Sequence, residues 1–136
     1  MGVAEAPGVA VIKVLVVEDD VDAAQNVVTG LRMLGYECRR AHDGLSALEM
    51  VDEFCPEVIL MDVTMPRMNG FEATRRIRAS KRCPEPLIVC FTSWSGQRAE
   101  DTARQAGCDA HVPKQDGLHR VDQAIRRLLA AQGSAG

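Results

Sequence analysis

The sequence has 136 residues, 46% hydrophobic and 26% charged, which suits one globular domain and excludes an intrinsically disordered chain. Its net charge of -3 argues against nucleic-acid binding, which requires a basic surface. No apolar run is long enough to span a membrane, and the first ten residues lack the basic and apolar parts of a signal peptide.

Strand-like and helix-like segments alternate along the chain. Residues 11–17, VIKVLVV, are almost wholly apolar, which predicts a strand covered on both faces. Apolar residues repeat at helical spacing over Ala24–Leu34 and the pattern closes at Gly35, which predicts a helix. A weaker strand is predicted at Glu37–Ala41, nearer a sheet edge, and a second helix over Leu45–Phe54.

The second half of the chain continues the alternation. Its predicted elements are a strand at Val58–Met61, a helix over Phe71–Arg78, a strand at Pro86–Thr92, a helix over Gln97–Ala106, a short strand at Ala110–Pro113 and a helix over Leu118–Leu128. The helix at Gln97–Ala106 has the weakest apolar stripe, made only of alanines, so we expect it to be the least firmly anchored element.

Five consecutive strand–helix units predict an α/β fold with a parallel sheet and helices on both of its faces. These five units use nearly all of the 136 residues and leave no room for a second domain. We expect one domain over residues 11–130, a flexible leader at residues 1–10 and a flexible tail at residues 131–136.

Polar side chains stand where four of the predicted strands end. Glu18 and Asp19 follow the first strand, Asp62 follows the third, Thr92 ends the fourth and Lys114 follows the fifth. Ligands of open α/β sheets bind at the carboxyl ends of the strands, so we expect these residues to converge. Clustered carboxylates suit Mg²⁺, a lysine and a hydroxyl suit a phosphate, and an Asp can form an aspartyl-phosphate. The pattern predicts Mg²⁺-assisted phosphoryl transfer onto an Asp.

Each of these residues has a simpler explanation when it is taken alone. A strand-terminal Asp often caps a helix or a turn, and we place Asp20 and Asp22 in this class, with Asp22 as the cap of the first helix. A run of basic residues reads as a solvated helix face rather than a partner-binding patch. That run consists of Arg75, Arg76, Arg78, Lys81 and Arg82.

The five cysteines are odd in number, widely spread and never in a C-x-x-C pair. This spacing argues against a disulfide framework or a zinc site, and the three histidines show no metal-ligand spacing either. We expect reduced thiols in a cytoplasmic protein, several of them buried as small apolar side chains.

Over Ile12–Leu129 the sequence resembles the receiver domain of bacterial two-component response regulators. The matching motifs are VLVVEDD, ILMDVTMPRMNGFE, VCFTSW and GCDAHVPK, of which the second is very specific. The resemblance implies a flavodoxin-like (βα)5 doubly wound sandwich with a five-stranded parallel sheet of order 2-1-3-4-5, here as a stand-alone, single-domain receiver.

The resemblance also implies a role for each site residue. It makes Asp62 the phospho-acceptor, Thr92 the switch hydroxyl and Lys114 the phosphate-binding lysine. The Mg²⁺ ligands that it implies are Asp62, Asp19, Glu18 through a metal-bound water, and the backbone carbonyl of Thr64.

The implied phosphoryl donor is a sensor histidine kinase or a histidine phosphotransfer protein. Phosphorylation would shift the face made by the fourth helix, the fifth strand and the fifth helix, where a downstream protein target would bind. The resemblance implies no nucleic-acid or membrane partner, a cytoplasmic location and no turnover of an external substrate.

The sequence departs from the family pattern near the end of the fifth strand. Lys114 is preceded by Pro113 and followed by Gln115, where the family has proline after the lysine. His111 stands where the family has a switch Tyr or Phe, and Trp94 lies close to the expected phosphate site. Trp94 could shield an acyl phosphate from water or contact a partner.

Two other functions remain as alternatives. A phosphatase of the haloacid-dehalogenase type also uses an Asp after a strand, but it requires a second acid two positions on, where this chain has Thr64. A pseudo-receiver would bind partners without phosphorylation; the acids, Thr92 and Lys114 count against it, whereas the altered end of the fifth strand favours it.

Overall fold

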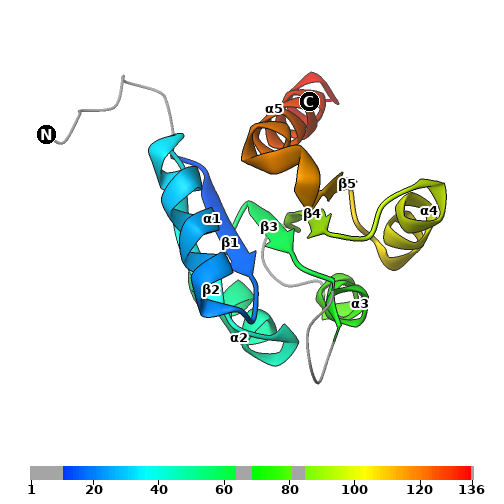
Figure 1. Ribbon diagram of the computed structural model, residues 1–136, viewed down its shortest axis with the longest axis horizontal. Helices are drawn as coiled ribbons and strands as arrows, with labels where there is room; N and C mark the ends of the chain where they lie inside the picture. The colour runs from blue at the N-terminus through cyan, green and yellow to red at the C-terminus, as the bar shows by residue number, and fades with distance from the viewer. Residues whose placement is uncertain (1–10, 64–68, 81–84, 136) are drawn as a thin grey trace, which may run out of the picture.

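Figure 1 shows the computed structural model, which describes residues 11–63, 69–80 and 85–135. The strands are β1 (Lys13–Val17), β2 (Glu37–Ala41), β3 (Val58–Met61), β4 (Leu87–Thr92) and β5 (Ala110–Pro113). The helices are α1 (Val21–Met33), α2 (Gly44–Phe54), α3 (Gly70–Ser80), α4 (Gln97–Ala106) and α5 (Gly117–Ala135), with a short 3-10 turn at Lys114–Asp116.

The strands form one parallel sheet in the order β2-β1-β3-β4-β5, which confirms the predicted fold. Val17 at the end of β1 pairs with Met61 at the end of β3, and Met61 pairs with Cys90 in β4. The carboxyl ends of β1 and β3 are therefore level with each other, and whatever follows them meets at one edge of the sheet.

Helices cover both faces of the sheet (Figure 1). On one face, Val14 and Val16 pack with residues of α1 and α5, and on the other, Leu15 and Val17 pack with residues of α2, α3 and α4. Successive strand residues point to opposite faces, so a strand buried on both sides must be apolar throughout. This explains the uninterrupted apolar run of β1.

The first helix begins at Val21, so its cap lies two residues before the predicted one. Asp20 is its N-cap, and the Asp20 carboxylate accepts a hydrogen bond of 2.9 Å from the backbone N–H of Ala23. Asp22 lies inside the first turn, where an acid still favours the positive end of the helix dipole. The prediction that Asp22 caps this helix is therefore wrong.

The last helix is longer than predicted. α5 continues to Ala135, whereas the predicted domain ends at residue 130, so residues 131–135 are helical. Whether this end of the helix is flexible stays a prediction, and the predicted leader at residues 1–10 lies outside the described residues.

The side chains of α4 that reach the core are small. Its buried residues are Ala99, Ala103 and Ala106, as the sequence predicted. The helix ends at Gly107, which has a φ of 111°, a left-handed conformation that favours glycine.

Two cysteines contradict the prediction of reduced thiols. Cys90 in β4 and Cys108 after α4 form a disulfide, with their Cα atoms 6.4 Å apart. Cys38 and Cys55 are not part of a disulfide. The prediction failed for the pair because 18 residues separate the two in sequence, and only the fold brings β4 and the end of α4 together.

Arg78 does not belong to a solvated helix face. Its guanidinium donates to the carbonyls of Gly107 and Pro86, at 3.0 and 2.6 Å, and to the Asp109 carboxylate at 2.7 Å. Arg78 therefore joins α3 to the start of β4 and to the α4–β5 connection. Arg75 and Arg76 have exposed side chains that pair with Glu72, as expected for a solvated face.

Candidate functional site

Hydrogen bonds that continue the parallel ladder place two acids at the carboxyl edge of the sheet. The backbone N–H of Glu18 donates to the carbonyl of Ala41, and that of Asp62 donates to the carbonyl of Val17, both at 3.0 Å. The sheet itself thus holds Glu18 and Asp62 at the strand ends, and Asp19 is the residue that follows Glu18.

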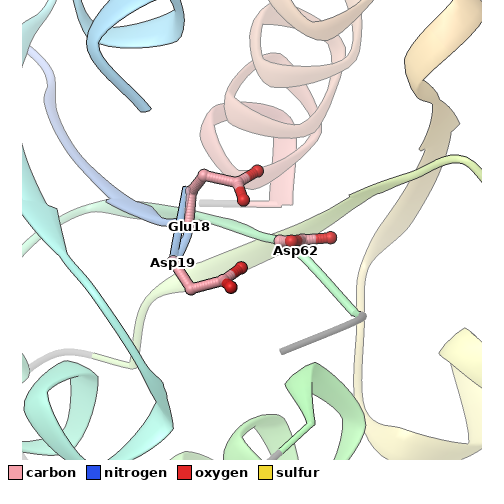
Figure 2. Close-up of side chains that lie close together, drawn as sticks. All are labelled: Glu18, Asp19 and Asp62. Carbon is pink, nitrogen blue, oxygen red and sulfur yellow. The ribbon is translucent and has the colours of Figure 1, made fainter. Parts of the chain in front are cut away.

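The carboxylates of Glu18, Asp19 and Asp62 form a cluster, with one oxygen of each within 4.8 Å of the other two. Figure 2 shows the three side chains directed into the same space from the ends of β1 and β3. Glu18 and Asp62 are buried, and Asp19 is exposed. Three carboxylates this close repel each other unless a cation or protons compensate them.

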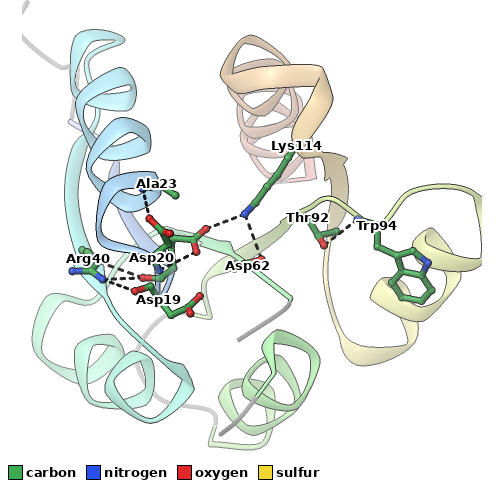
Figure 3. A network of polar contacts seen from close by, with 9 residues as sticks. Asp19, Asp20, Ala23, Arg40, Asp62, Thr92, Trp94 and Lys114 are labelled. Atoms are coloured by element: carbon green, nitrogen blue, oxygen red, sulfur yellow. Dashed lines mark hydrogen bonds and ion pairs between the residues drawn. The ribbon is translucent and has the colours of Figure 1, made fainter. Parts of the chain in front are cut away.

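Lys114 provides one such cation. Its Nζ donates to Glu18 Oε1 at 3.0 Å and lies 3.7 Å from Asp62 Oδ1. Figure 3 shows the Lys114 side chain directed toward Asp62. Partial burial alone would lower the pKa of Lys114, but the hydrogen bond to Glu18 and the negative charges of Asp62 and Glu18 outweigh it and raise that pKa. Lys114 therefore stays a cation and links β5 to the acids.

Arg40 in β2 holds the segment that carries Glu18 and Asp19. Its guanidinium donates to the carbonyl of Glu18 at 3.2 and 3.3 Å and to the carbonyl of Asp19 at 3.2 Å (Figure 3). No role for Arg40 was expected from the sequence pattern. The sequence feature that could have pointed to Arg40 is its position near the carboxyl end of β2, the strand that pairs with β1.

Gly70 begins α3 directly against the backbone of Asp62. A Cβ atom at this position would overlap the carbonyl oxygen of Asp62 and would lie 2.9 Å from the Met61 Cγ atom. The backbone N–H of Gly70 also donates to the carbonyl of Val63 at 2.9 Å. The glycine of the MPRMNG stretch is therefore required by close packing against the residue that carries the central carboxylate.

Thr92 lies at the end of β4, and its side chain is buried. Its hydroxyl oxygen accepts a hydrogen bond of 3.3 Å from the backbone N–H of Trp94, which Figure 3 shows on the side of the site away from the acids. Among the described residues, the acids and Lys114 come together, whereas the Thr92 hydroxyl contacts the β4–α4 loop.

Two further contacts hold this loop. The imidazole Nε2 of His111 in β5 lies 2.9 Å from the carbonyl oxygen of Trp94, so a protonated Nε2 donates to it. The indole ring of Trp94 meets the ring of Phe71 in α3 edge to face, with ring centroids 6.1 Å apart. Trp94 thus connects Thr92, His111 and the start of α3.

Clustered carboxylate oxygens are hard ligands, and their chemistry fits Mg²⁺. Glu18, Asp19 and Asp62 each offer one carboxylate oxygen to such an ion. The further ligand expected at the backbone carbonyl of Thr64 lies outside the described residues.

Comparison with known proteins shows the family. Residues 14–126 match the response regulator receiver domain, which is most of the chain. The chain belongs to the response regulator receiver family. It is therefore a receiver of two-component signalling, and the acidic pocket of Glu18, Asp19 and Asp62 is the metal-site arrangement typical of such receivers.

Similar proteins agree with this assignment. The receiver is 31% identical over 118 residues to the response regulator MprA of Mycobacterium ulcerans (strain Agy99), a match that covers 87% of this chain and 50% of that protein. The chain thus spans about half the length of the curated relatives it matches.

Solved structures share the fold. The Vibrio cholerae chemotaxis protein CheY4 has a TM-score of 0.80 at 28% identity, with 87% of this chain and 98% of that chain covered. A receiver domain protein from Methanospirillum hungatei JF-1 has a TM-score of 0.82 at 21% identity, over 93% and 100% of the two chains, which shows the fold alone.

Receiver domains generally act as signalling phosphoacceptors rather than as catalysts of external substrates, and they partner with histidine kinases. Within the described part of the chain, no helix combines the length and the apolar character needed to cross a membrane.

Proposed function

We propose that this receiver accepts a phosphoryl group from a phosphohistidine onto Asp62, with Mg²⁺, and that phosphorylation changes its α4–β5–α5 face for a protein target. One observation carries the proposal. The buried Asp62 carboxylate lies 3.7 Å from the Lys114 ammonium, in a cluster with the carboxylates of Glu18 and Asp19.

Asp62 has the position of a nucleophile. One of its carboxylate oxygens would bond to phosphorus while the P–N bond of the phosphohistidine breaks, and the donor imidazole would keep the electron pair. Bound Mg²⁺ would offset the negative charge of the phosphoryl oxygens. Asp19 and Asp62 would hold the ion, Glu18 would orient a water bound to it, and the carbonyl of Thr64 would complete the ligands.

Lys114 would bind the transferred group. Its ammonium is already shared between Glu18 and Asp62, so it can turn to a phosphoryl oxygen without leaving the site. The Thr92 hydroxyl would donate its proton to another phosphoryl oxygen while its oxygen still accepts from the N–H of Trp94, so a reorientation of Thr92 toward the phosphoryl group would act on the loop that carries Trp94.

The contacts of Trp94 support a route from Asp62 to the α4–β5–α5 face. Reorientation of Thr92 pulls on the β4–α4 loop, and the same loop is bonded to His111 through the Trp94 carbonyl. His111 would then take part in switching through a hydrogen bond, in place of the aromatic side chain of the family.

The donor would be a sensor histidine kinase or a histidine phosphotransfer protein, and we place the receiver in the cytoplasm. The Asp62 phosphoryl group would be lost by hydrolysis, with no turnover of an external substrate. A pseudo-receiver that binds proteins without phosphorylation is the second candidate, favoured by the unusual Pro113-Lys114-Gln115 sequence and the 3-10 turn that begins at Lys114.

The test is phosphorylation by acetyl phosphate and Mg²⁺, followed by intact mass spectrometry. We expect a mass gain of one phosphoryl group that is lost in Asp62→Asn, which keeps the size of the side chain and removes the nucleophile. Asp22→Asn is the matched control, since it removes an exposed acid outside the cluster, and it should be phosphorylated like the wild type.

The same preparation is then offered a phosphorylated histidine phosphotransfer domain. Transfer to the wild type and not to Asp62→Asn supports the proposal. Failure of both donors, in protein shown by circular dichroism to be folded, would assign the chain to the pseudo-receivers.

A further inference from the structure

The bonded pair of Cys90 and Cys108 lies outside the phosphorylation site. Cys90 is fully buried in β4 and Cys108 is 8% exposed just after α4, with Cα atoms 6.4 Å apart. This separation is within the range that a disulfide can bridge without movement of the backbone.

The bond joins a fixed part of the fold to the end of α4. Cys90 pairs with Met61 of β3 on one side and with His111 of β5 on the other, so it is fixed inside the sheet. Cys108 donates its backbone N–H to the carbonyl of Ala103 at 2.9 Å, so it moves with the last turn of α4. A link between the two sulphur atoms therefore ties α4 to the sheet.

This tie matters because α4 has few other anchors. The only described side chains of α4 that are buried are three alanines, and the burial free energy of a side chain grows with its apolar area. Cys90 and Cys108 pack in the same core cluster as Ala103 and Ala106. The disulfide therefore lies in the interface between α4 and the sheet.

Cys108 is nearly buried, but it lies at the wall of a cavity. It lines a cavity of about 280 Å³ between α4, β5 and α5, together with Arg104, Arg120 and Arg127. Arginine side chains stabilise the thiolate of a nearby cysteine, which is the form that reacts with peroxide. The same cavity is lined by the acids Glu100 and Asp109, so the arginines do not act on Cys108 alone. Cys108 is nevertheless the member of the pair that faces the cavity, and the sulfur of Cys90 lies beside it to resolve it.

We propose that Cys90 and Cys108 are a reversible redox modification site that controls the freedom of α4. The Cys108 thiolate attacks hydrogen peroxide and becomes a sulfenic acid, and the hydroxide released takes a proton to form water. The Cys90 thiol then displaces the sulfenic hydroxyl as a second water and closes the disulfide. In total, two thiols give up two electrons and two protons, and one peroxide becomes two waters. A dithiol reductant returns the pair to two thiols by thiol–disulfide exchange and is itself oxidised to a disulfide.

The oxidised pair holds α4 against the sheet, and the reduced pair releases it. The consequence for signalling rests on the proposed function, since it requires that phosphorylation of Asp62 moves α4. An oxidised receiver would be phosphorylated at Asp62 and fail to change its α4–β5–α5 face.

The first test counts thiols and maps the bond. The full chain is reduced with a dithiol, treated with hydrogen peroxide, alkylated in denaturant and digested for mass spectrometry. We expect two of the five cysteines to escape alkylation and to appear as one Cys90–Cys108 peptide pair. Cys90→Ala and Cys108→Ala should each abolish that pair.

Cys38→Ala is the matched control, because Cys38 is also buried and burial raises the pKa of its thiol to about 11. It should form the Cys90–Cys108 pair like the wild type. A pair that instead involves Cys55, or five alkylated cysteines after peroxide, would overturn the proposal.

The second test measures hydrogen exchange of the α4 amides in the unphosphorylated protein. Oxidation should slow their exchange by about tenfold. The disulfide reduces the conformational entropy that α4 gains when it opens locally, so the open state becomes less populated. Cys108→Ala should show no response to peroxide. Equal α4 exchange in the oxidised and reduced wild type would contradict the proposal.

The third test adds acetyl phosphate and Mg²⁺ and records the mass gain at Asp62 beside the α4 exchange. We expect phosphorylation to change α4 exchange in the reduced protein only. Absence of the mass gain would count against the proposed phosphorylation, and the first two tests would still decide the fate of the cysteine pair. An equal change in both redox states would overturn the control of α4 by the pair.

Discussion

The position of Asp62 depends on the residue that begins the next helix. Gly70 leaves just enough space for α3 to start against the Asp62 carbonyl, and any side chain there would push the two apart. The helix start is also fixed by Asn69, whose side chain accepts a hydrogen bond of 2.9 Å from the backbone N–H of Glu72.

Gly70→Ala should therefore impair both stability and phosphorylation. We expect the free energy of unfolding to fall by about 2 kcal/mol because the added methyl overpacks the contact. We expect the initial rate of phosphorylation by acetyl phosphate to fall by about tenfold, because a displaced nucleophile loses its alignment. Urea denaturation and intact mass spectrometry measure the two effects.

Asn69→Ala is the control for a weakened helix start without a steric clash. It should cost about 1 kcal/mol of stability, as the loss of a cap does, and leave the phosphorylation rate close to that of the wild type. A Gly70→Ala protein that is phosphorylated at the wild-type rate would show that this close contact does not position Asp62.

At the residue scale, the polar residues at the predicted strand ends were the feature of the sequence that predicted the site. Glu18, Asp19, Asp62 and Lys114 could be predicted to meet, because the topology of a parallel sheet brings its carboxyl ends together. Arg40 could not be predicted, since its role depends on which carbonyls lie within reach of its guanidinium. The metal, phosphate and switch roles of these residues stay predictions.

Among the elements, α3 and the α4–β5 connection are joined by one side chain. Arg78 reaches from α3 to the carbonyls of Pro86 and Gly107 and to the Asp109 carboxylate. Asp109 in turn accepts a hydrogen bond of 2.9 Å from the backbone N–H of Ile88 in β4. These contacts fix the amino-terminal end of β4 to the segment that leads into β5.

Arg78→Ala should lower the free energy of unfolding by about 2 kcal/mol, since it removes charge-assisted hydrogen bonds and leaves partly buried carbonyls without a donor. Urea denaturation measures the change. Arg75→Ala, which removes an exposed arginine of the same helix, should change stability by less than about 0.5 kcal/mol. Equal effects of the two substitutions would refute the special role of Arg78.

The order and type of the elements could be predicted because apolar spacing differs between buried strands and covering helices. The predicted bounds of β2, β3, β5 and α4 agree with the structure. The structure differs from the prediction at the start of α1, where a local hydrogen bond makes Asp20 the cap. It also differs at Arg78 and at the Cys90–Cys108 pair, whose contacts join residues that are distant in sequence.

At the scale of the whole molecule, the acidic cluster is a source of instability that a cation can remove. The cluster brings three carboxylates together in a protein of net charge -3, and Lys114 is the described cation within it. Binding of a metal to the native state alone raises the stability of the whole domain.

We therefore expect Mg²⁺ to raise the Tm of the wild type, by an amount equivalent to about 1.4 kcal/mol at a free concentration of about ten times its Kd. Asp19→Asn should raise the Tm of the metal-free protein, because one repelling charge is gone, and should lose most of the response to Mg²⁺. Differential scanning calorimetry with and without a chelator measures both.

Asp22→Asn is again the control and should respond to Mg²⁺ like the wild type. A response of Asp19→Asn equal to that of the wild type would mean that the stabilising ion binds somewhere other than the cluster.

Trp94 is the one tryptophan of the chain; the residue is 41% exposed, and its ring contacts Phe71. When the protein is excited at the long-wavelength edge of its absorption, the fluorescence therefore comes from the single tryptophan in this loop. The intensity and colour of that emission depend on the water and the ring around this one indole. The molecule carries its own optical reporter, placed between Thr92 and α4, and stopped-flow measurements can follow that loop in time without any attached dye.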